Sequence, residues 1–316
     1  MEQRSLGRSG IKVPPLMFGG NVFGWTIDKA QSHRILDRLV DAGLHAIDTA
    51  DVYSAWAPGH QGGESETIIG EWLKASGKRS QVVIATKVGM KMGSGDQGLS
   101  RDWIMKEVEA SLRRLQTDVI DLYQAHKDDE TVPLEETLGA FADLVKAGKV
   151  RAIGASNYSA PRLKQALEVS ARDGLPRYET LQPLYNLMDR RAFEEALGPL
   201  CRAEGIGVIN YYALASGFLS GKYRSEADFG KSKRGGNMGK YLTPRGLKVL
   251  AALDAVAGET AATPAQVAIA WLLAKPVVTA PIASATSLDQ LEDLLGATAL
   301  GLSPAQVAAL DEASAE

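Results

Sequence analysis

The chain has 316 residues, of which 45% are hydrophobic and 23% charged, and its net charge is -3. This balance gives no strong attraction to nucleic acid or to an anionic membrane, so we expect neither as a partner. The one cysteine, Cys201, excludes a disulfide framework, so we expect a reduced, cytoplasmic compartment. One cysteine is also too few for a cysteine-built zinc site, and the four histidines show no metal-ligand spacing, so we expect no metal.

The start of the chain predicts neither a signal peptide nor a membrane anchor. Its first ten residues, MEQRSLGRSG, lack the apolar core of a signal peptide. Glycines and prolines between residues 3 and 15 predict a small hairpin ahead of the main fold. The most apolar stretch, residues 261–280, is interrupted by Pro264, Lys275 and Pro276 and does not predict a membrane span. We expect a soluble, unprocessed protein.

From residue 16 onward, short apolar runs alternate with segments of helical periodicity. The first strand is expected at residues 16–18, and Asp28 is expected to cap a helix that stops at Gly43. The second strand ends at Asp48 within the sequence HAIDTADVY. The remaining strands are apolar runs that often end in a polar residue, and they are expected at residues 81–87, 118–126, 150–157, 179–182, 206–212 and 277–280.

The helices between these strands have recognisable start signals. Ser100 is a typical N-cap, and Pro133 and Pro161 are typical of a first helical turn. The other helices are expected at residues 62–73, 193–204 and 288–295, with two apolar helical segments before the eighth strand. A glycine- and lysine-rich excursion, residues 216–241, follows the seventh strand.

Eight strands that alternate with helices predict an α/β protein with a (β/α)8 barrel, a short N-terminal hairpin and C-terminal helices. The alternation never pauses for a linker, so we expect one domain over residues 1–316. In such a barrel the C-terminal ends of the strands form one mouth, where the chemistry takes place. The last polar residues of the expected strands should therefore meet although they are far apart in sequence.

The charged and aromatic residues of this set have a chemical interpretation as a carbonyl-reducing site. Tyr53 can give a proton to a developing alkoxide, and the ammonium of Lys87 would ease that step. Asp48 would keep a buried Lys87 charged, and His126 could donate a hydrogen bond to the substrate oxygen. The neutral residues Ser156, Asn157 and Gln182 suit a nicotinamide carboxamide, and Tyr211 can stack on its ring.

The sequence resembles the aldo-keto reductase superfamily of NAD(P)H-dependent (β/α)8 oxidoreductases. The motifs that carry the resemblance span most of the chain and are DTADVY at 48–53, ATK at 85–87, DLYQAH at 121–126, GASN at 154–157, LQ at 181–182 and YYALASGFLSGKY at 211–223. The resemblance implies that Asp48, Tyr53, Lys87 and His126 form a catalytic tetrad. It also implies that the cofactor is lined by Gly20, Asn21, Asp48, Ser156, Asn157, Gln182, Tyr211, Leu214, Ser216, Gly217 and Lys222.

The resemblance is weaker where the family holds the adenosine half of the cofactor. The residues at the corresponding positions are Ser284, Thr286, Gln290 and Asp293, and the chain departs from the family pattern at Ser284 and Leu294. No arginine at Thr286 is available for a 2′-phosphate, and Lys233 and Arg234 are expected to serve instead. We expect NADPH as cofactor, with NADH as the alternative.

Other interpretations remain open at this point. Residues 93–98, GSGDQG, match a dinucleotide fingerprint but follow the strand too late, and residues 230–232, GKS, lack the earlier glycine of a P-loop. A cofactor-binding regulatory subunit is the main functional alternative, although the channel-associated members of the superfamily carry Asn where this chain has His126. A Schiff-base enzyme using Lys87 is a third. An aromatic-lined pocket for a small carbonyl substrate is expected.

Overall fold

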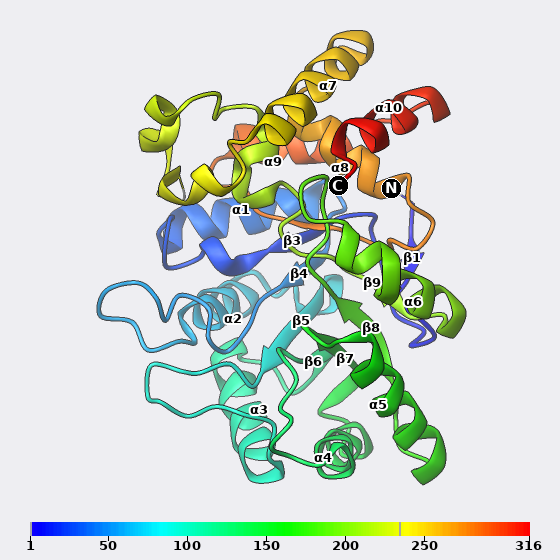
Figure 1. Cartoon of the computed structure of the whole chain (residues 1–316). Coiled ribbons are helices and arrows are strands. Elements are labelled where there is room, and N and C mark those ends of the chain that lie inside the picture. Colours follow the sequence, from blue (N-terminus) through cyan, green and yellow to red (C-terminus); the bar gives the residue numbers. More distant parts are fainter. Residues whose placement is uncertain (1, 234) are drawn as a thin grey trace.

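The computed structural model describes residues 2–233 and 235–316 (Figure 1). Its main element is a parallel sheet with the strand order β10-β3-β4-β5-β6-β7-β8-β9. The strands are β3 (Met17–Gly19), β4 (Ala46–Asp48), β5 (Val83–Val88), β6 (Ile120–Ala125), β7 (Val150–Ser156), β8 (Tyr178–Gln182), β9 (Gly207–Val208) and β10 (Ile282–Ala283). The two ends of the sheet meet, because Val208 pairs with Val278 and accepts a hydrogen bond from the Thr279 amide at 2.8 Å. The predicted α/β barrel is therefore confirmed.

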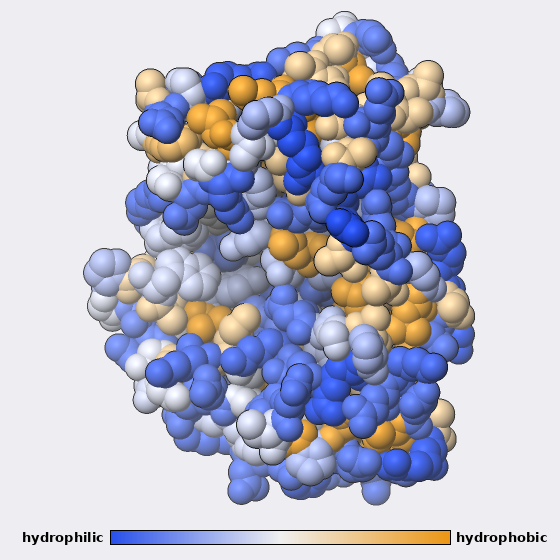
Figure 2. Space-filling view, viewed as in Figure 1, coloured by the Kyte–Doolittle hydropathy of each residue, from blue (hydrophilic) through white to orange (hydrophobic). Residues whose placement is uncertain are grey.

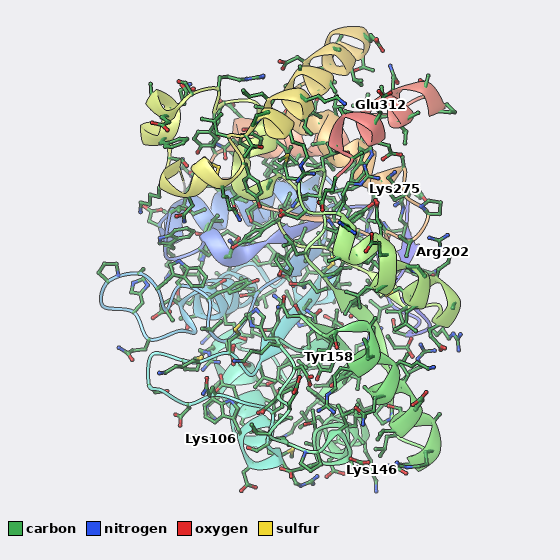
Figure 3. The ribbon with its side chains drawn as sticks, in the orientation of Figure 1. Lys106, Lys146, Tyr158, Arg202, Lys275 and Glu312 are labelled. Atoms are coloured by element: carbon green, nitrogen blue, oxygen red, sulfur yellow. The ribbon has the colours of Figure 1, made fainter. Side chains whose placement is uncertain are left out.

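Helices surround the sheet, as Figure 1 shows. They are α1 (Lys29–Asp41), α2 (Glu64–Ser76), α3 (Arg101–Leu115), α4 (Leu134–Lys146), α5 (Ala160–Asp173), α6 (Gly198–Glu204), α7 (Pro244–Thr260), α8 (Pro264–Leu273), α9 (Leu288–Ala297) and α10 (Pro304–Ser314). The expected start signals are used: Asp28 accepts from the Gln31 amide, and Ser100 accepts from the Trp103 amide. Charged residues such as Lys106 and Lys146, labelled in Figure 3, lie on the outer helices α3 and α4.

The N-terminal hairpin consists of β1 (Arg4–Ser5) and β2 (Lys12–Val13), which pair antiparallel as predicted. Leu6, Ile11 and Val13 from this hairpin are buried together with inward-facing strand residues such as Met17 and Ala46. This smaller hydrophobic cluster fills the N-terminal end of the barrel, whereas the main hydrophobic core joins the strands to the surrounding helices. Polar residues are left for the C-terminal end of the barrel. Figure 2 shows that the face of the molecule in this view is hollowed near its centre.

The structure differs from the sequence prediction at the eighth and the seventh strand. The eighth strand is not residues 277–280 but β10, which begins at Ile282, because Pro281 has no amide hydrogen for a continuous ladder. Residues 277–280 instead form the segment that lies beside β9 and donates backbone hydrogen bonds to the Val208 carbonyl. The seventh strand is also shorter than residues 206–212, although Tyr211 still pairs with Leu184.

Other segments show more regular structure than expected. The helix at 193–204 begins with a π-helical turn, Phe193–Leu197, before α6. The excursion 216–241 folds into 3-10 helices η4 (Ala215–Ser220), η5 (Glu226–Lys231) and η6 (Gly235–Lys240), drawn in green to yellow in Figure 1. Residues 93–98 form a loop. Across residues 2–233 and 235–316, no helix combines the length and the hydrophobicity needed to cross a bilayer.

Candidate active site

Polar residues from five strands gather at the C-terminal end of the barrel. Asp48 is the last residue of β4, Lys87 lies near the end of β5, and His126 directly follows β6. Ser156 and Gln182 end β7 and β8 and are paired in register. The side chains of these five residues are almost completely buried. The barrel therefore brings together strand ends that the sequence separates by more than 130 residues, as between Asp48 and Gln182.

The centre of the site is the ammonium group of Lys87. It donates to Asp48 Oδ2 at 2.7 Å, to the Thr49 carbonyl at 2.7 Å and to the Tyr53 hydroxyl at 2.9 Å. A lysine ammonium has three hydrogens, so all of its donors are satisfied. The Tyr53 hydroxyl in turn donates to Asp48 Oδ2 at 3.3 Å. The phenol, the ammonium and the carboxylate thus form one hydrogen-bonded group.

Opposing effects act on the charge of Lys87. Its side chain is fully buried, which lowers the pKa of Lys87 from its ordinary value, because burial disfavours the charged form. The negative charges of Asp48, Asp51 and Glu66 oppose this shift. The contact with Asp48 therefore offsets the free-energy cost of burying a charged lysine inside the barrel.

His126 lies beside Tyr53 and is neutral at neutral pH. The two rings meet edge to face with centroids 5.9 Å apart. Burial and the positive charges of Lys87 and Lys127 hold the pKa of His126 well below its usual value. His126 Nδ1 is buried and has no hydrogen-bond partner among the described residues. A neutral imidazole carries one N–H, so His126 can act as a donor without bringing a charge.

The neutral residues form a second chain of hydrogen bonds next to the charged group. The Tyr211 hydroxyl donates to Asn157 Oδ1 at 2.8 Å, and Asn157 Nδ2 donates to the His126 carbonyl at 2.9 Å. Ser156 Oγ donates to the Gln182 carbonyl at 2.9 Å. Asn157 adopts a left-handed conformation with φ of 55°, which Asn tolerates better than most residues. Burial raises the pKa of Tyr211 to about 12, so its hydroxyl keeps its proton.

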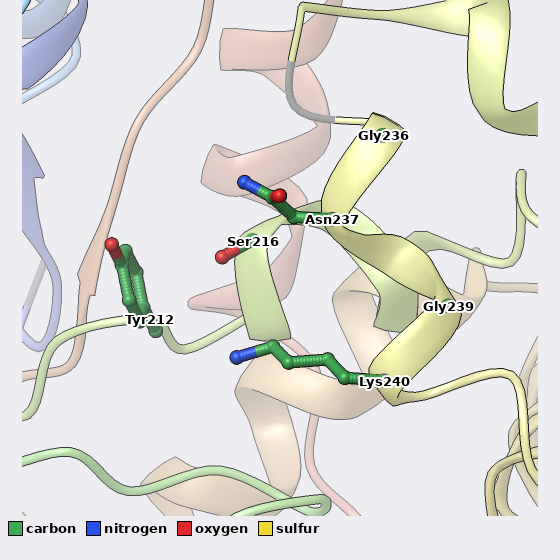
Figure 4. A pocket seen from close by; sticks show the side chains of 6 residues that line it. All are labelled: Tyr212, Ser216, Gly236, Asn237, Gly239 and Lys240. Atoms are coloured by element: carbon green, nitrogen blue, oxygen red, sulfur yellow. The ribbon is translucent and has the colours of Figure 1, made fainter.

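A cavity of about 420 Å³ is lined by Tyr212, whose ring contacts that of Tyr211 (Figure 4). Ser216, Asn237 and Lys240 approach it from η4 and η6, and Tyr212 lies opposite them. The chain can fold back here because Ser216 has φ of 58° and Gly217 has φ of 101°. The excursion is evident in the sequence, but Tyr212, Asn237 and Lys240 are not among the predicted site residues. Only folding shows which excursion residues return to the mouth, since no motif marks them.

The other expected cofactor residues lie around this cavity or farther along the same edge. The side chain of Lys222 approaches Gly217, because its Nζ lies 3.5 Å from where a Cβ on that glycine would be. Leu214 precedes this turn. Lys233 Nζ donates to the Trp25 carbonyl at 2.9 Å and so joins the excursion to the loop after η1 (Gly20–Val22). Arg234 lies outside the described residues.

The N-terminal and C-terminal candidates contact each other. Ser284 Oγ donates to Asn21 Oδ1 at 2.7 Å, and a Cβ on Gly20 would lie 3.1 Å from the Asp48 carbonyl. Beyond them, Gln290 Oε1 accepts from the Thr286 amide at 2.9 Å and from its hydroxyl at 3.0 Å.

Asp293 is placed differently from the other candidates. Its Oδ1 accepts from the hydroxyl of Thr263, the N-cap residue of α8, at 2.8 Å. In this structure Asp293 therefore supports a helix end, and Leu294, where the chain departs from the family pattern, is buried.

Aromatic rings lie next to Tyr53. Trp25 meets Trp56 edge to face at 5.5 Å, and Trp56 meets Tyr53 at 5.9 Å. Trp56 is 49% exposed, which is unusual for a large aromatic side chain. This arrangement provides an apolar surface that leads to the Tyr53 hydroxyl.

Comparison with known proteins agrees with the fold. The model of the Aldo/keto reductase family matches residues 15–315. The uncharacterized oxidoreductase YrpG of Bacillus subtilis (strain 168) is 37% identical over 310 residues, which are 96% of this chain and 92% of that protein. A probable voltage-gated potassium channel subunit beta of Arabidopsis thaliana is 34% identical, over 93% of this chain and 90% of its own length. The L-glyceraldehyde 3-phosphate reductase of Escherichia coli O157:H7 is 31% identical, over 93% of this chain and 86% of that enzyme. The chain therefore belongs to the aldo/keto reductase family.

Proposed function

We propose that this protein reduces aldehydes and ketones to alcohols, with hydride from NADPH and a proton from Tyr53. One observation carries the proposal: the buried ammonium of Lys87 contacts both the Asp48 carboxylate and the Tyr53 hydroxyl. A hydroxyl beside a cation gives up its proton more readily, which is what protonation of an alkoxide requires. Family membership and the relatives named as oxidoreductase and reductase support NAD(P)H-dependent carbonyl reduction in general.

Each residue of the charged group has a role in this proposal. Tyr53 donates its proton to the carbonyl oxygen as the alcohol forms, and Lys87 stabilises the phenolate that remains. Asp48 balances the charge of Lys87 in a buried setting. His126, which is neutral because burial lowers its pKa, donates a hydrogen bond that orients the carbonyl oxygen.

The residues around the mouth fit a nicotinamide dinucleotide. When bound, NADPH supplies the hydride. Gln182 Oε1 receives no hydrogen bond from any described residue, so it can accept from the carboxamide. Tyr211 is assigned to stack on the nicotinamide ring, and the cavity between Tyr212 and Lys240 is assigned to a phosphate-bearing part of the cofactor.

We further propose a preference for NADPH over NADH. The excursion carries several lysines near the cavity, among them Lys222 and Lys240, and neither forms an ion pair within the described residues. Calorimetric titration should give a dissociation constant for NADPH about tenfold or more below that for NADH. Equal affinities would contradict the preference. The single cysteine, Cys201, is buried and agrees with the proposed cytoplasmic location.

The potassium channel relatives support a second candidate, a regulatory subunit that binds the cofactor and turns over little. Steady-state oxidation of NADPH by a panel of aromatic aldehydes separates the two. The proposed reductase should complete many cycles, at about 1 per second or faster with its better substrates. Oxidation of one equivalent of bound NADPH, without further cycles, would favour the regulatory subunit.

A further inference from the structure

A row of inward-facing residues lies directly beneath the mouth. Strand register pairs Gln124 on β6 with Lys87 on β5. On its other side, Gln124 pairs with Gly154 on β7, which pairs with Thr180 on β8. Gln182 follows Thr180 by two residues, so both side chains point into the barrel. Gln124 and Gln182 therefore belong to different strands, separated by β7.

Gly154 lets these two glutamines meet. A Cβ at Gly154 would lie 3.2 Å from Gln124 Cγ and 2.2 Å from Thr180 Oγ1, so a larger residue would enter the space that they occupy. Across this space Gln182 Nε2 donates to Gln124 Oε1 at 3.4 Å. The same Nε2 donates to Asp48 Oδ1 at 2.8 Å.

The orientation of both amides follows from Asp48. An ionised carboxylate only accepts hydrogen bonds, so Gln182 must turn its nitrogen toward Asp48. The second hydrogen of that nitrogen then requires an acceptor, and Gln124 must present its oxygen. This leaves Gln124 Nε2 buried with no hydrogen-bond partner among the described residues. An unpaired buried donor is unfavourable, which indicates that the contact with Gln182 is what maintains the orientation of the Gln124 amide.

We propose that Gln124 is a positioning residue for the reduction, because it holds the Gln182 amide with its nitrogen on Asp48 and its oxygen free for the cofactor. The inference rests on the proposed function and deepens it. With the cofactor bound, Gln182 would connect the nicotinamide carboxamide to the Asp48 carboxylate that partners Lys87. Without the contact to Gln124, the Gln182 amide can rotate and donate less well to Asp48.

The effect of this contact should appear in the pH dependence. A weaker donor leaves more negative charge on Asp48, which disfavours the Tyr53 phenolate and moves loss of its proton to higher pH. The acidic groups that act on Lys87 are Asp48 from β4, which contacts it, and two more distant ones, Asp51 from the following loop and Glu66 from α2. His126 faces Tyr53 from the end of β6 and is neutral. None of them is changed by a substitution at Gln124.

The test compares Gln124→Met with the wild-type enzyme. The alkaline limb of the kcat/KM profile should move up by about half a pH unit, and the KM for NADPH should rise about threefold. Thr180→Val is the matched control, because Thr180 is equally buried in the same row and its Oγ1 is also unpaired in the described structure. Its side chain has no contact with Asp48 or the Gln182 amide among the described hydrogen bonds, so both values should stay at wild-type level.

A second variant and a second readout keep the test decisive. Gln124→Asn preserves the polar amide but withdraws it from Gln182, so it should reproduce the shift even if Gln124→Met folds poorly. The phenolate absorbance that Tyr53→Phe removes reports the same midpoint without turnover. If the wild-type protein reduces no carbonyl compound, the proposed function fails while this midpoint can still be compared. Unchanged midpoints in both Gln124 variants, or an equal shift in Thr180→Val, would overturn the inference.

Discussion

Two buried clusters of charged side chains lie on opposite faces of strand β5. Lys87 points into the barrel toward Asp48 and Tyr53. The neighbouring residue, Thr86, points outward, where its hydroxyl donates to Glu66 Oε1 at 2.6 Å. Because successive residues of a strand face opposite sides, one short segment supplies both clusters.

The outer cluster is enclosed between α2 and α3. Arg114 Nε donates to Glu66 Oε2 at 2.7 Å, and Arg114 Nη2 donates to Glu107 and to Ser111. Glu66 and Glu107 are buried, and the burial of Glu107 raises its pKa. Asp51 also points into this interior, and its Oδ2 has no hydrogen-bond partner among the described residues.

The inner and the outer cluster differ in what surrounds their polar groups. In the inner cluster, the Tyr53 hydroxyl sits at the mouth beside His126 and the aromatic surface of Trp56. In the outer cluster, the carboxylates of Glu66 and Glu107 are buried against Arg114, behind β5. We therefore expect the ion pair at the mouth to act on a substrate, and the ion pairs behind the same strand to act mainly on stability.

Replacing the central cation of the inner cluster should have the largest effect. Lys87→Met removes the charge beside Tyr53, so kcat/KM for aldehyde reduction should fall by about 10³-fold. Steady-state kinetics measure this loss, and circular dichroism monitors the fold. A loss below about tenfold in a folded variant would remove Lys87 from the proposed mechanism.

The outer cation should show the opposite pattern. Arg114→Met leaves Glu66 and Glu107 buried without their partner, so the free energy of unfolding should fall by about 3 kcal/mol. Denaturant unfolding measures the change. Activity per folded molecule should stay within about twofold of the wild type. A large loss of turnover without loss of stability would contradict the division between the two clusters.

Asp51 should give a smaller, pH-dependent effect. Burial and the charges of Glu66 and Glu107 hold the pKa of Asp51 well above its usual value in the folded chain. A raised folded-state pKa means that its contribution is fully present below the unfolded pKa of about 4 and is lost as pH rises through the folded pKa. The stability of Asp51→Asn relative to the wild type should therefore improve as pH rises from about 4. Asp118→Asn, at an exposed position, is the control and should show no such trend.

Much of the fold follows from local signals in the sequence. The helix starts at Asp28 and Ser100 were predictable because capping depends on neighbouring backbone amides. The eighth strand was misplaced because residues 277–280 have the apolar character of a strand, whereas the residues that pair with β3 follow Pro281.

The site was predictable only in part for a similar reason. Asp48, Lys87 and His126 stand at strand ends, and the barrel brings all strand ends together. The roles of Gln124 and Lys240 depend on residues from other strands or on a returning loop, and no local pattern marks them. Asp51 belongs to the same motif as Asp48, but it faces the outer cluster, which only the three-dimensional structure reveals.

The most direct measurement of the central claim is the turnover of Tyr53→Phe, because the substitution removes only the hydroxyl that Lys87 contacts. The account predicts that aldehyde reduction falls by about 10²-fold or more while the dissociation constant for NADPH changes less than about threefold. Wild-type turnover in this variant, with cofactor binding intact, would contradict the assignment of Tyr53 as the proton donor.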